Sequence, residues 1–167
     1  MKILGLPGRD ETTVAWLESI LNGLDFPQCD YTVQRYACWQ GDDDFDLDLE
    51  VERARGDDVG LVVAKSMGTR VAIHAAQRDT LLAERYVLIG VPLKVYREGE
   101  LELLNALCAR RPVLLIQQTE DFLGSCQELR GAVGEHHNVC FAEIPGSDHV
   151  YSDVATLRSH IQACYPG

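Results

Sequence analysis

The sequence predicts an α/β fold: a three-layer α/β/α sandwich around a mostly parallel sheet of about six strands. Short apolar runs rich in β-branched residues alternate with stretches of helical periodicity. The apolar runs are nearly continuous, which is typical of parallel strands covered by helices on both faces. A chain of 167 residues can bury one substantial core. We expect one domain over residues 1–167, because no repeat or proline-rich linker divides the chain.

The strands and helices are expected to alternate along the chain. Residues 12–24 and 152–164 repeat apolar side chains at spacings of three and four, so each predicts an amphipathic helix. Another helix is expected directly after Ser66. Six segments have the pattern of buried strands: residues 2–6, 32–38, 59–64, 86–91, 113–117 and 139–144.

The segment "FDLDLEVERAR", residues 45–55, has a mixed pattern. Its apolar and acidic residues alternate as in a half-exposed strand, yet its place between two strands calls for a crossover helix, which we expect over residues 46–55. The acidic residues around its start lack the glycine and glutamate spacing of a calcium loop. We interpret them as a solvated helix entrance, where carboxylates favour the positive end of the helix dipole: Asp42, Asp43, Asp44, Asp46 and Asp48.

Charge and composition exclude several classes of function. The formal net charge of −11 disfavours nucleic acid and anionic membrane surfaces as partners. The N-terminal segment lacks the apolar core of a signal peptide, and no apolar stretch approaches the ~20 residues that cross a bilayer, so we expect no membrane insertion and a cytoplasmic location. The six cysteines are scattered singly without a CxxC motif, so we expect reduced, mostly buried thiols and no zinc.

The stretch "VVAKSMGTRVAIHAA", residues 62–76, predicts a sharp turn from a strand into a helix with Ser66 at the bend. A nucleophile on such a turn has a strained backbone and leaves room only for small residues two positions away, here Ala64 and Gly68. The helix that follows would direct free N–H groups toward an oxyanion, with Met67 as the first donor. We expect His74, on another stripe of this helix, to be structural.

Two further segments supply the groups that a serine nucleophile needs. "RPVLLIQQTEDFLG", residues 111–124, is a strand that breaks into a polar turn with Asp121. "VCFAEIPGSDHVYSD", residues 139–153, is a strand followed by a glycine turn and His149. Each side chain lies beyond the carboxyl end of a predicted strand, where ligand sites gather in parallel sheets. The chain order is Ser66, Asp121, His149.

These three segments in this order resemble a small lidless serine hydrolase of the α/β-hydrolase fold superfamily, over essentially the whole chain. The resemblance implies a minimal α/β-hydrolase fold, with Ser66 as nucleophile, His149 as general base and acid, and Asp121 as the carboxylate that orients the imidazole. Glu120 is the alternative acid because it adjoins Asp121. No metal and no organic cofactor are implied.

The resemblance also implies an oxyanion hole and shows departures from the family pattern, one of which is Gln118, where a glycine often precedes the acidic residue by three. The backbone N–H groups of Met67 and of Arg9, or alternatively Gly8, in the loop "LPGRD" would hold the oxyanion. The family usually has glycine at the position of Ala64, and a His-Gly pair where this chain has Pro7-Gly8. Alanine is small enough to keep the bend.

The reaction implied is hydrolysis of a carboxylic ester or thioester through an acyl-enzyme, in the manner of a carboxylesterase. Only residues 91–100 separate a strand from the next helix, so no lid domain fits and the site should be open. We expect a small or short-chain acyl substrate, on a small molecule or on an acylated protein, bordered by Leu93, Tyr96, Phe122 and Val150. The sequence indicates no oligomeric state.

Other interpretations remain open. The chain could be a binding or scaffold protein that kept the fold without turnover, because fold alone does not fix function. It could also be a perhydrolase or acyltransferase that uses the same residues with another acceptor. Lys65, beside Ser66, could favour an anionic substrate group, but we expect a solvent-facing lysine with no special role.

Overall fold

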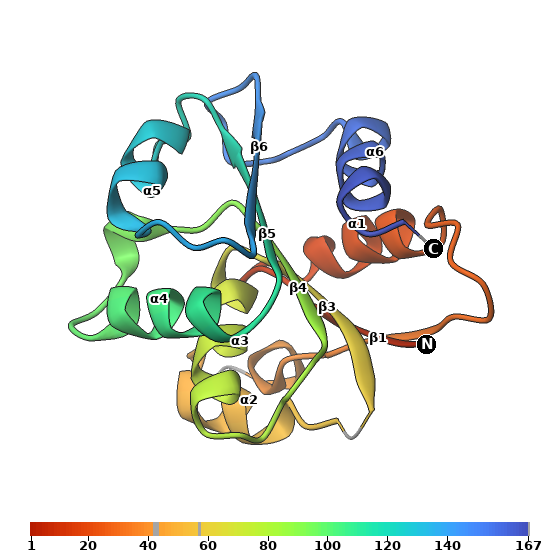
Figure 1. The fold of residues 1–167 in the computed structure, drawn as a ribbon. Helices are drawn as coiled ribbons and strands as arrows, with labels where there is room; N and C mark the ends of the chain where they lie inside the picture. Colours follow the sequence, from red (N-terminus) through yellow and green to blue (C-terminus); the bar gives the residue numbers. More distant parts are fainter. Residues whose placement is uncertain (42–43, 57, 167) are drawn as a thin grey trace.

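The computed structural model describes residues 1–41, 44–56 and 58–166. Within these residues six strands form one sheet in the order β2-β1-β3-β4-β5-β6 (Figure 1). Every neighbouring pair is parallel, so the predicted mostly parallel sheet is in fact wholly parallel. The strands are β1 (Lys2–Leu6), β2 (Asp30–Val33), β3 (Val59–Lys65), β4 (Arg85–Ile89), β5 (Val113–Gln118) and β6 (Val139–Ile144).

Helices cover both faces of the sheet, which gives the three layers that the sequence predicts. Helices α1 and α6 lie on one face, and α2, α3, α4 and α5 lie on the other (Figure 1). Each face buries its own apolar cluster against the sheet. The helices are α1 (Thr12–Leu21), α2 (Leu47–Arg53), α3 (Met67–Gln77), α4 (Glu100–Arg110), α5 (Cys126–Ala132) and α6 (Val154–Cys164).

The strand predicted over residues 32–38 is wrong beyond Val33. Strand β2 ends at Val33, and Ala37–Gln40 form a short 3-10 helix. The reason is long-range bonding: the buried Tyr36 donates its phenol O–H to the carbonyl of Pro7 (2.7 Å), and the N–H of Ala37 donates to the carboxylate of Glu50 (2.6 Å). These bonds draw the chain away from the sheet edge.

The helix predicted over residues 46–55 is confirmed as α2. Asp46 is its N-cap and accepts a hydrogen bond from the N–H of Leu49 (3.1 Å), and Asp48 lies in the first turn and pairs with Arg78. These carboxylates therefore mark a helix entrance, as expected. Asp42 and Asp43 lie outside the described residues.

Helix α5 is absent from the sequence-based assignment, although its start has a recognisable signal. The side chain of Ser125 accepts from the N–H of Glu128 (3.1 Å), and the carboxylate of Glu128 accepts from the N–H of Ser125 (2.7 Å). This is a capping box, readable as Ser-x-x-Glu in the sequence. The helix has only seven residues, so its apolar periodicity was too short to detect.

The sheet topology places a crevice at the carboxyl ends of β1 and β3. These strands are neighbours, with Leu6 paired to Ala64 at their ends. The connections that leave β1 and β3 lead to α1 on one face and to α3 on the other (Figure 1). Ligands bind at such switch points in open parallel sheets because the two loops separate there.

The described residues also bear on the cysteine and membrane expectations. All six cysteines are unpaired thiols, but only Cys108 and Cys126 are buried, and Cys140 is exposed. The expectation of mostly buried thiols is therefore wrong.

Among the described helices, none has the length and apolar character that crossing a bilayer requires.

Candidate active site

Ser66 lies on a strained bend between β3 and α3. Its backbone has φ of +50° and ψ of −112°, a conformation that residues with a Cβ rarely adopt. The backbone N–H of Ser66 donates to the carbonyl of Ile89 in β4 (3.0 Å), and this bond holds Ser66 at the switch point. Gly68 is needed for the same turn, since a Cβ on it would lie 2.1 Å from the carbonyl oxygen of Leu6.

Ser66, His149 and Asp121 form one hydrogen-bonded chain. The Oγ of Ser66 lies 2.8 Å from Nε2 of His149, and Nδ1 of His149 lies 2.7 Å from Oδ2 of Asp121. These partners fit an imidazole that donates Nδ1–H to the carboxylate and accepts the serine hydroxyl at Nε2. Such an arrangement can remove a proton from the hydroxyl as it attacks a carbonyl carbon.

Asp121, and not Glu120, is the carboxylate that contacts the imidazole. Asp121 is 2% exposed, whereas Glu120 is exposed to solvent. Burial raises the pKa of Asp121, but hydrogen bonds from His149, Tyr151 and the N–H of Leu123 outweigh it and hold the pKa below its usual value. The carboxylate is therefore ionised at neutral pH.

Two residues to which the sequence assigned no role support this chain of hydrogen bonds. The buried Tyr151 donates its phenol O–H to Asp121 (2.7 Å) and accepts from the backbone N–H of Gln118 (2.9 Å). The amide oxygen of Gln118 accepts from the backbone N–H of His149 (2.9 Å), and its NH2 group donates to Asp148 (2.9 Å). No sequence motif marks them, because their role depends on contacts between β5 and the loop after β6.

The expectation for Lys65 is wrong. Its side chain does not face solvent: the residue is 3% exposed, and its ammonium donates to the carbonyl of His149 (2.9 Å). Burial lowers its pKa to about 8, although the carboxylates of Asp121 and Asp148 oppose this effect. The sequence pattern misled because strand β3 is buried on both faces, so its last side chain also points inward.

The residues proposed to hold an oxyanion lie around Ser66. Met67 is the first residue of α3, where backbone N–H groups have no acceptor within the helix. Across the crevice, a Cβ on Gly8 would lie 3.7 Å from Cβ of Ser66, and Arg9 follows it at the edge of the same cavity. The structure thus brings all three residues to the bend, and the choice between Gly8 and Arg9 stays a prediction.

A cavity of about 310 Å³ opens beside Ser66 and His149. Its walls come from the loop after β1, the start of α1 and the loop of His149, and they include Trp16 and Val150. Phe122 lies edge-on to the imidazole at 5.7 Å between ring centroids and, like Val150, is 57% exposed.

Of the four predicted border residues, only Val150 lines this cavity, and Phe122 lies beside it against the His149 ring. Leu93 and Tyr96 pack against the apolar cluster on the α3 and α4 face of the sheet and are absent from the cavity's described walls. Leu93 also packs beside Gly124, where a Cβ would lie 3.1 Å from its own. Both side chains were expected at the site because their loop follows β4, but the loop turns them toward the core.

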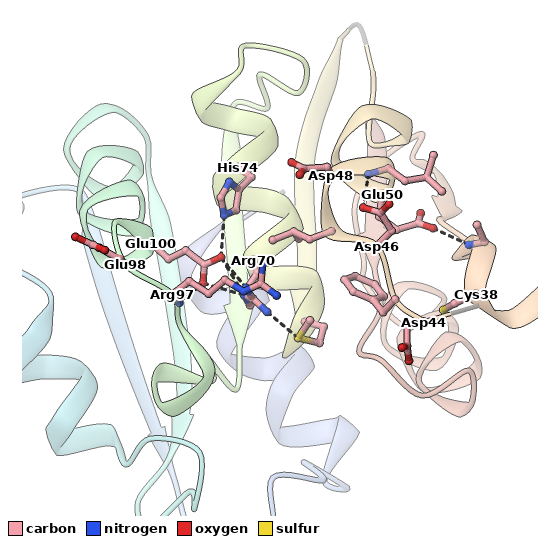
Figure 2. Close-up of a pocket in the computed structure, with 15 residues that line it drawn as sticks. Cys38, Asp44, Asp46, Asp48, Glu50, Arg70, His74, Arg97, Glu98 and Glu100 are labelled. Carbon is pink, nitrogen blue, oxygen red and sulfur yellow. Dashed lines mark hydrogen bonds and ion pairs between the residues drawn. The ribbon is translucent and has the colours of Figure 1, made fainter. Parts of the chain in front are cut away.

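A larger cavity of about 710 Å³ lies between α2 and α3, on the other side of Met67 (Figure 2). Arg70 and His74 both point at the buried carboxylate of Glu100, with Arg70 donating through Nε (2.9 Å) and Nη2 (2.8 Å), and His74 Nε2 at 2.9 Å. His74 thus has the structural place that was expected of it. Ser66 is not among the described residues that line this cavity, so the smaller cavity is the one that serves the hydroxyl.

Solved structures with the same fold include hydrolases of several kinds. An N-formylmaleamic acid deformylase from Pseudomonas putida is 14% identical, with 96% of this chain and 91% of that chain covered and a TM-score of 0.63. A type II thioesterase from the yersiniabactin biosynthetic pathway is 15% identical, with coverage of 97% and 90% and a TM-score of 0.63. At these identities the likeness shows the fold alone.

One further solved structure of the same fold belongs to a longer protein. An uncharacterized protein from Bacillus cereus is 19% identical with a TM-score of 0.65, and this chain spans 59% of its length. No curated protein matches the sequence. The family model described as "Alpha/beta hydrolase domain" matches residues 46–162, which include Ser66, Asp121 and His149. The chain therefore belongs to the alpha/beta hydrolase family.

Proposed function

We propose that this protein is a serine hydrolase that cleaves a carboxylic ester, or a thioester, through an acyl-enzyme. The observation that carries the proposal is the continuous hydrogen-bonded chain from Ser66 Oγ through His149 to Asp121. Membership of the alpha/beta hydrolase family supports it. A positive φ at Ser66 adds support, because such strain persists where a side chain must be presented in one orientation.

The reaction follows from the positions of these groups. His149 takes the proton of Ser66 as Oγ bonds to the carbonyl carbon, and the carbonyl oxygen becomes an oxyanion held by the N–H of Met67 and one N–H of the loop after β1. The imidazolium then protonates the leaving alcohol or thiol as its bond to carbon breaks. A water molecule, deprotonated by the same imidazole, releases the acid and restores Ser66.

Asp121 acts through His149 in this proposal. Its carboxylate stays ionised and fixes the imidazole with Nδ1 protonated, so that Nε2 faces Ser66 as an acceptor. The negative charge also stabilises the imidazolium that forms during attack. A carboxamide at this position would favour the opposite tautomer.

The cavity supports a small or short-chain acyl group. Its volume of about 310 Å³ is at the lower end of the range for small-molecule sites, and Trp16 and Val150 give it apolar surface. Two structural neighbours of the same fold are a thioesterase and a deformylase, which supports hydrolysis as the class of reaction. Esters and thioesters are favoured over amides here because their leaving groups need less protonation.

A fluorophosphonate probe tests this proposal. We expect covalent labelling of Ser66, located by mass spectrometry, and hydrolysis of p-nitrophenyl acetate and butyrate faster than of longer esters. Ser66→Ala and His149→Ala should abolish both. Ser159→Ala, which removes an exposed hydroxyl on α6, is the matched control and should label as the wild type does. A folded protein that neither labels nor hydrolyses would instead favour the scaffold interpretation.

A further inference from the structure

The ammonium of Lys65 is buried beneath the loop that carries His149. Its Nζ donates to the backbone carbonyl of His149 (2.9 Å) and lies 4.6 Å from the centre of the Tyr151 ring, over its face. A Cβ built on Gly90 would lie 3.0 Å from Nζ and 3.1 Å from Cε1 of His149. The ammonium and the imidazole therefore border the same small space.

The loop of His149 needs such support because its backbone is strained. His149 and Tyr151 have φ of +60° and +61°, a conformation that costs about 1 kcal/mol or more for a residue with a Cβ. Strain of this kind persists only where surrounding contacts fix the backbone. Gln118 holds the N–H of His149, and Lys65 holds its carbonyl, so both peptide groups of this residue are bound by buried side chains.

Stability does not explain a lysine at this position. An ammonium loses its hydration when it is buried, and an apolar side chain of similar length would avoid that cost. The carboxylates of Asp121 and Asp148 favour the charged form of Lys65, but neither forms a direct ion pair with it among the described contacts. A methionine could reproduce neither the N–H donated to the carbonyl of His149 nor the charge over the Tyr151 ring, and only the first of these holds the backbone of His149.

We propose that Lys65 is a positioning residue that fixes the loop of His149, so that the imidazole stays between Ser66 and Asp121. This inference rests on the proposed function, since it assigns Lys65 a part in the same reaction. Lys65 directly precedes Ser66 in the chain, so one strand end supplies both the hydroxyl and the group that holds its base in reach. Lys65 itself touches neither Ser66 Oγ nor the reacting carbonyl in this role.

Lys65→Met is the test variant, with Lys94→Met as its matched control. Lys94 is exposed and donates its ammonium to the carbonyl of Phe122 (2.9 Å), so its loss removes an equivalent bond from the loop of Asp121 without touching the backbone of His149. For p-nitrophenyl acetate, a neutral ester, we expect Lys65→Met to lower kcat about tenfold to a hundredfold with KM within about twofold. Lys94→Met should leave both constants within about twofold. Lys65→Leu serves as a second variant if Lys65→Met folds poorly.

A proton NMR measurement makes the test independent of turnover. The Nδ1 proton shared with Asp121 should give a low-field signal in the wild type, assigned by its loss in His149→Gln. We expect that signal to broaden or disappear in Lys65→Met and to persist in Lys94→Met. If the wild type neither labels nor hydrolyses, the proposed function fails, while this signal still reports on Lys65.

Two outcomes would overturn the inference. In the first, Lys65→Met keeps both the low-field signal and the wild-type kcat. In the second, the substitution raises KM for esters that carry a carboxylate and leaves kcat and neutral esters unchanged, which would make Lys65 a group that binds an anionic substrate.

Discussion

Tyr151 and His149 donate hydrogen bonds to the same oxygen of Asp121. The phenol O–H and the imidazole Nδ1 each lie 2.7 Å from Oδ2, and the other oxygen accepts from the N–H of Leu123 at 2.9 Å. Burial raises the pKa of Tyr151 far above its usual value, so the phenol keeps its proton and remains a donor. The carboxylate is thus held from two directions, and its orientation toward His149 depends on Tyr151.

Tyr151→Phe should reduce both turnover and stability. The variant leaves Asp121 with one donor fewer and leaves the N–H of Gln118 without its acceptor, so the free energy of unfolding should fall by about 1 to 3 kcal/mol. A less constrained carboxylate should lower kcat by about threefold to tenfold. Urea denaturation and hydrolysis of p-nitrophenyl acetate measure the two effects.

Tyr165→Phe is the control for this substitution. Tyr165 is also buried in the same apolar cluster as Tyr151, and it donates its phenol O–H to the carbonyl of Tyr86 (3.0 Å) near the amino end of β4, whereas Ser66 lies at the carboxyl end. It should lose a comparable amount of stability with kcat unchanged. Equal kcat losses in both variants would show that Tyr151 has no specific role beside Asp121.

Gly68→Ala should strongly destabilise the protein. Its Cβ would lie 2.1 Å from the carbonyl oxygen of Leu6, a backbone atom that can move only if β1 or α3 shifts. We expect a loss of about 3 kcal/mol in the free energy of unfolding. Gly131→Ala in α5, where a Cβ meets nothing within 4 Å, should instead stabilise by about 0.5 to 1 kcal/mol. Thermal melts measure both effects, and melting temperatures that shift in the same direction in the two variants would contradict the special need for glycine at position 68.

Glu100→Gln should destabilise the protein at neutral pH and not at low pH. Burial raises the pKa of Glu100, but hydrogen bonds from Arg70, the N–H of Arg97 and His74 outweigh it and lower the pKa. The carboxylate therefore contributes stability that is present above its unfolded pKa of about 4.3 and is lost as pH falls through the folded value. At pH 7 the variant leaves buried Arg70 unpaired, and we expect a loss of about 2 to 4 kcal/mol.

The pH dependence distinguishes this effect from a general loss of packing. Chemical denaturation of both proteins between pH 7 and pH 3 should show the difference in unfolding free energy narrowing below about pH 4. Glu102→Gln, an exposed substitution on the same helix, should change stability by less than about 0.5 kcal/mol throughout. A difference that stays constant down to pH 3 would mean that the charge of Glu100 contributes nothing.

Lys65 should make stability depend on alkaline pH. Burial lowers its pKa to about 8, whereas an unfolded lysine titrates near about 10.4. Between these values the unfolded chain binds more protons, so the contribution of Lys65 to the free energy of unfolding rises with pH. Relative to Lys65→Met, the wild type should gain about 2 to 3 kcal/mol between pH 7 and pH 10, measured by urea denaturation. No relative gain would indicate an ammonium that remains hydrated.

The sequence predicted most of the fold because buried parallel strands carry a strong local pattern. Strands β1 and β6 have the predicted limits, and β3 and β5 each extend one residue beyond them. The strand prediction was wrong after Val33, because Tyr36 and Ala37 form hydrogen bonds with distant residues that no local sequence pattern indicates. Helix α5 was not predicted because its sequence signal lies in its N-terminal capping box and not in an apolar periodicity.

The residues of the candidate site likewise fall into those that a local sequence pattern predicts and those that it does not. Ser66, Asp121 and His149 could be located because each follows a strand end, and the structure brings them within hydrogen-bonding distance. Tyr151 and Gln118 could not, since their contribution appears only when β5 and the loop after β6 meet. The error over Lys65 has the same origin: burial at the end of β3 depends on neighbouring strands.

The long separation of Ser66 and His149 also bears on how the protein is made. The two side chains that share a hydrogen bond are 83 residues apart, and His149 follows the last strand of the sheet. Translation produces Ser66 well before the ribosome reaches β6, and domains settle as units once their chain is complete. If the proposed function holds, a nascent or truncated chain therefore carries Ser66 as an ordinary alcohol, which becomes a nucleophile only when β6 has paired and His149 has come within reach of it.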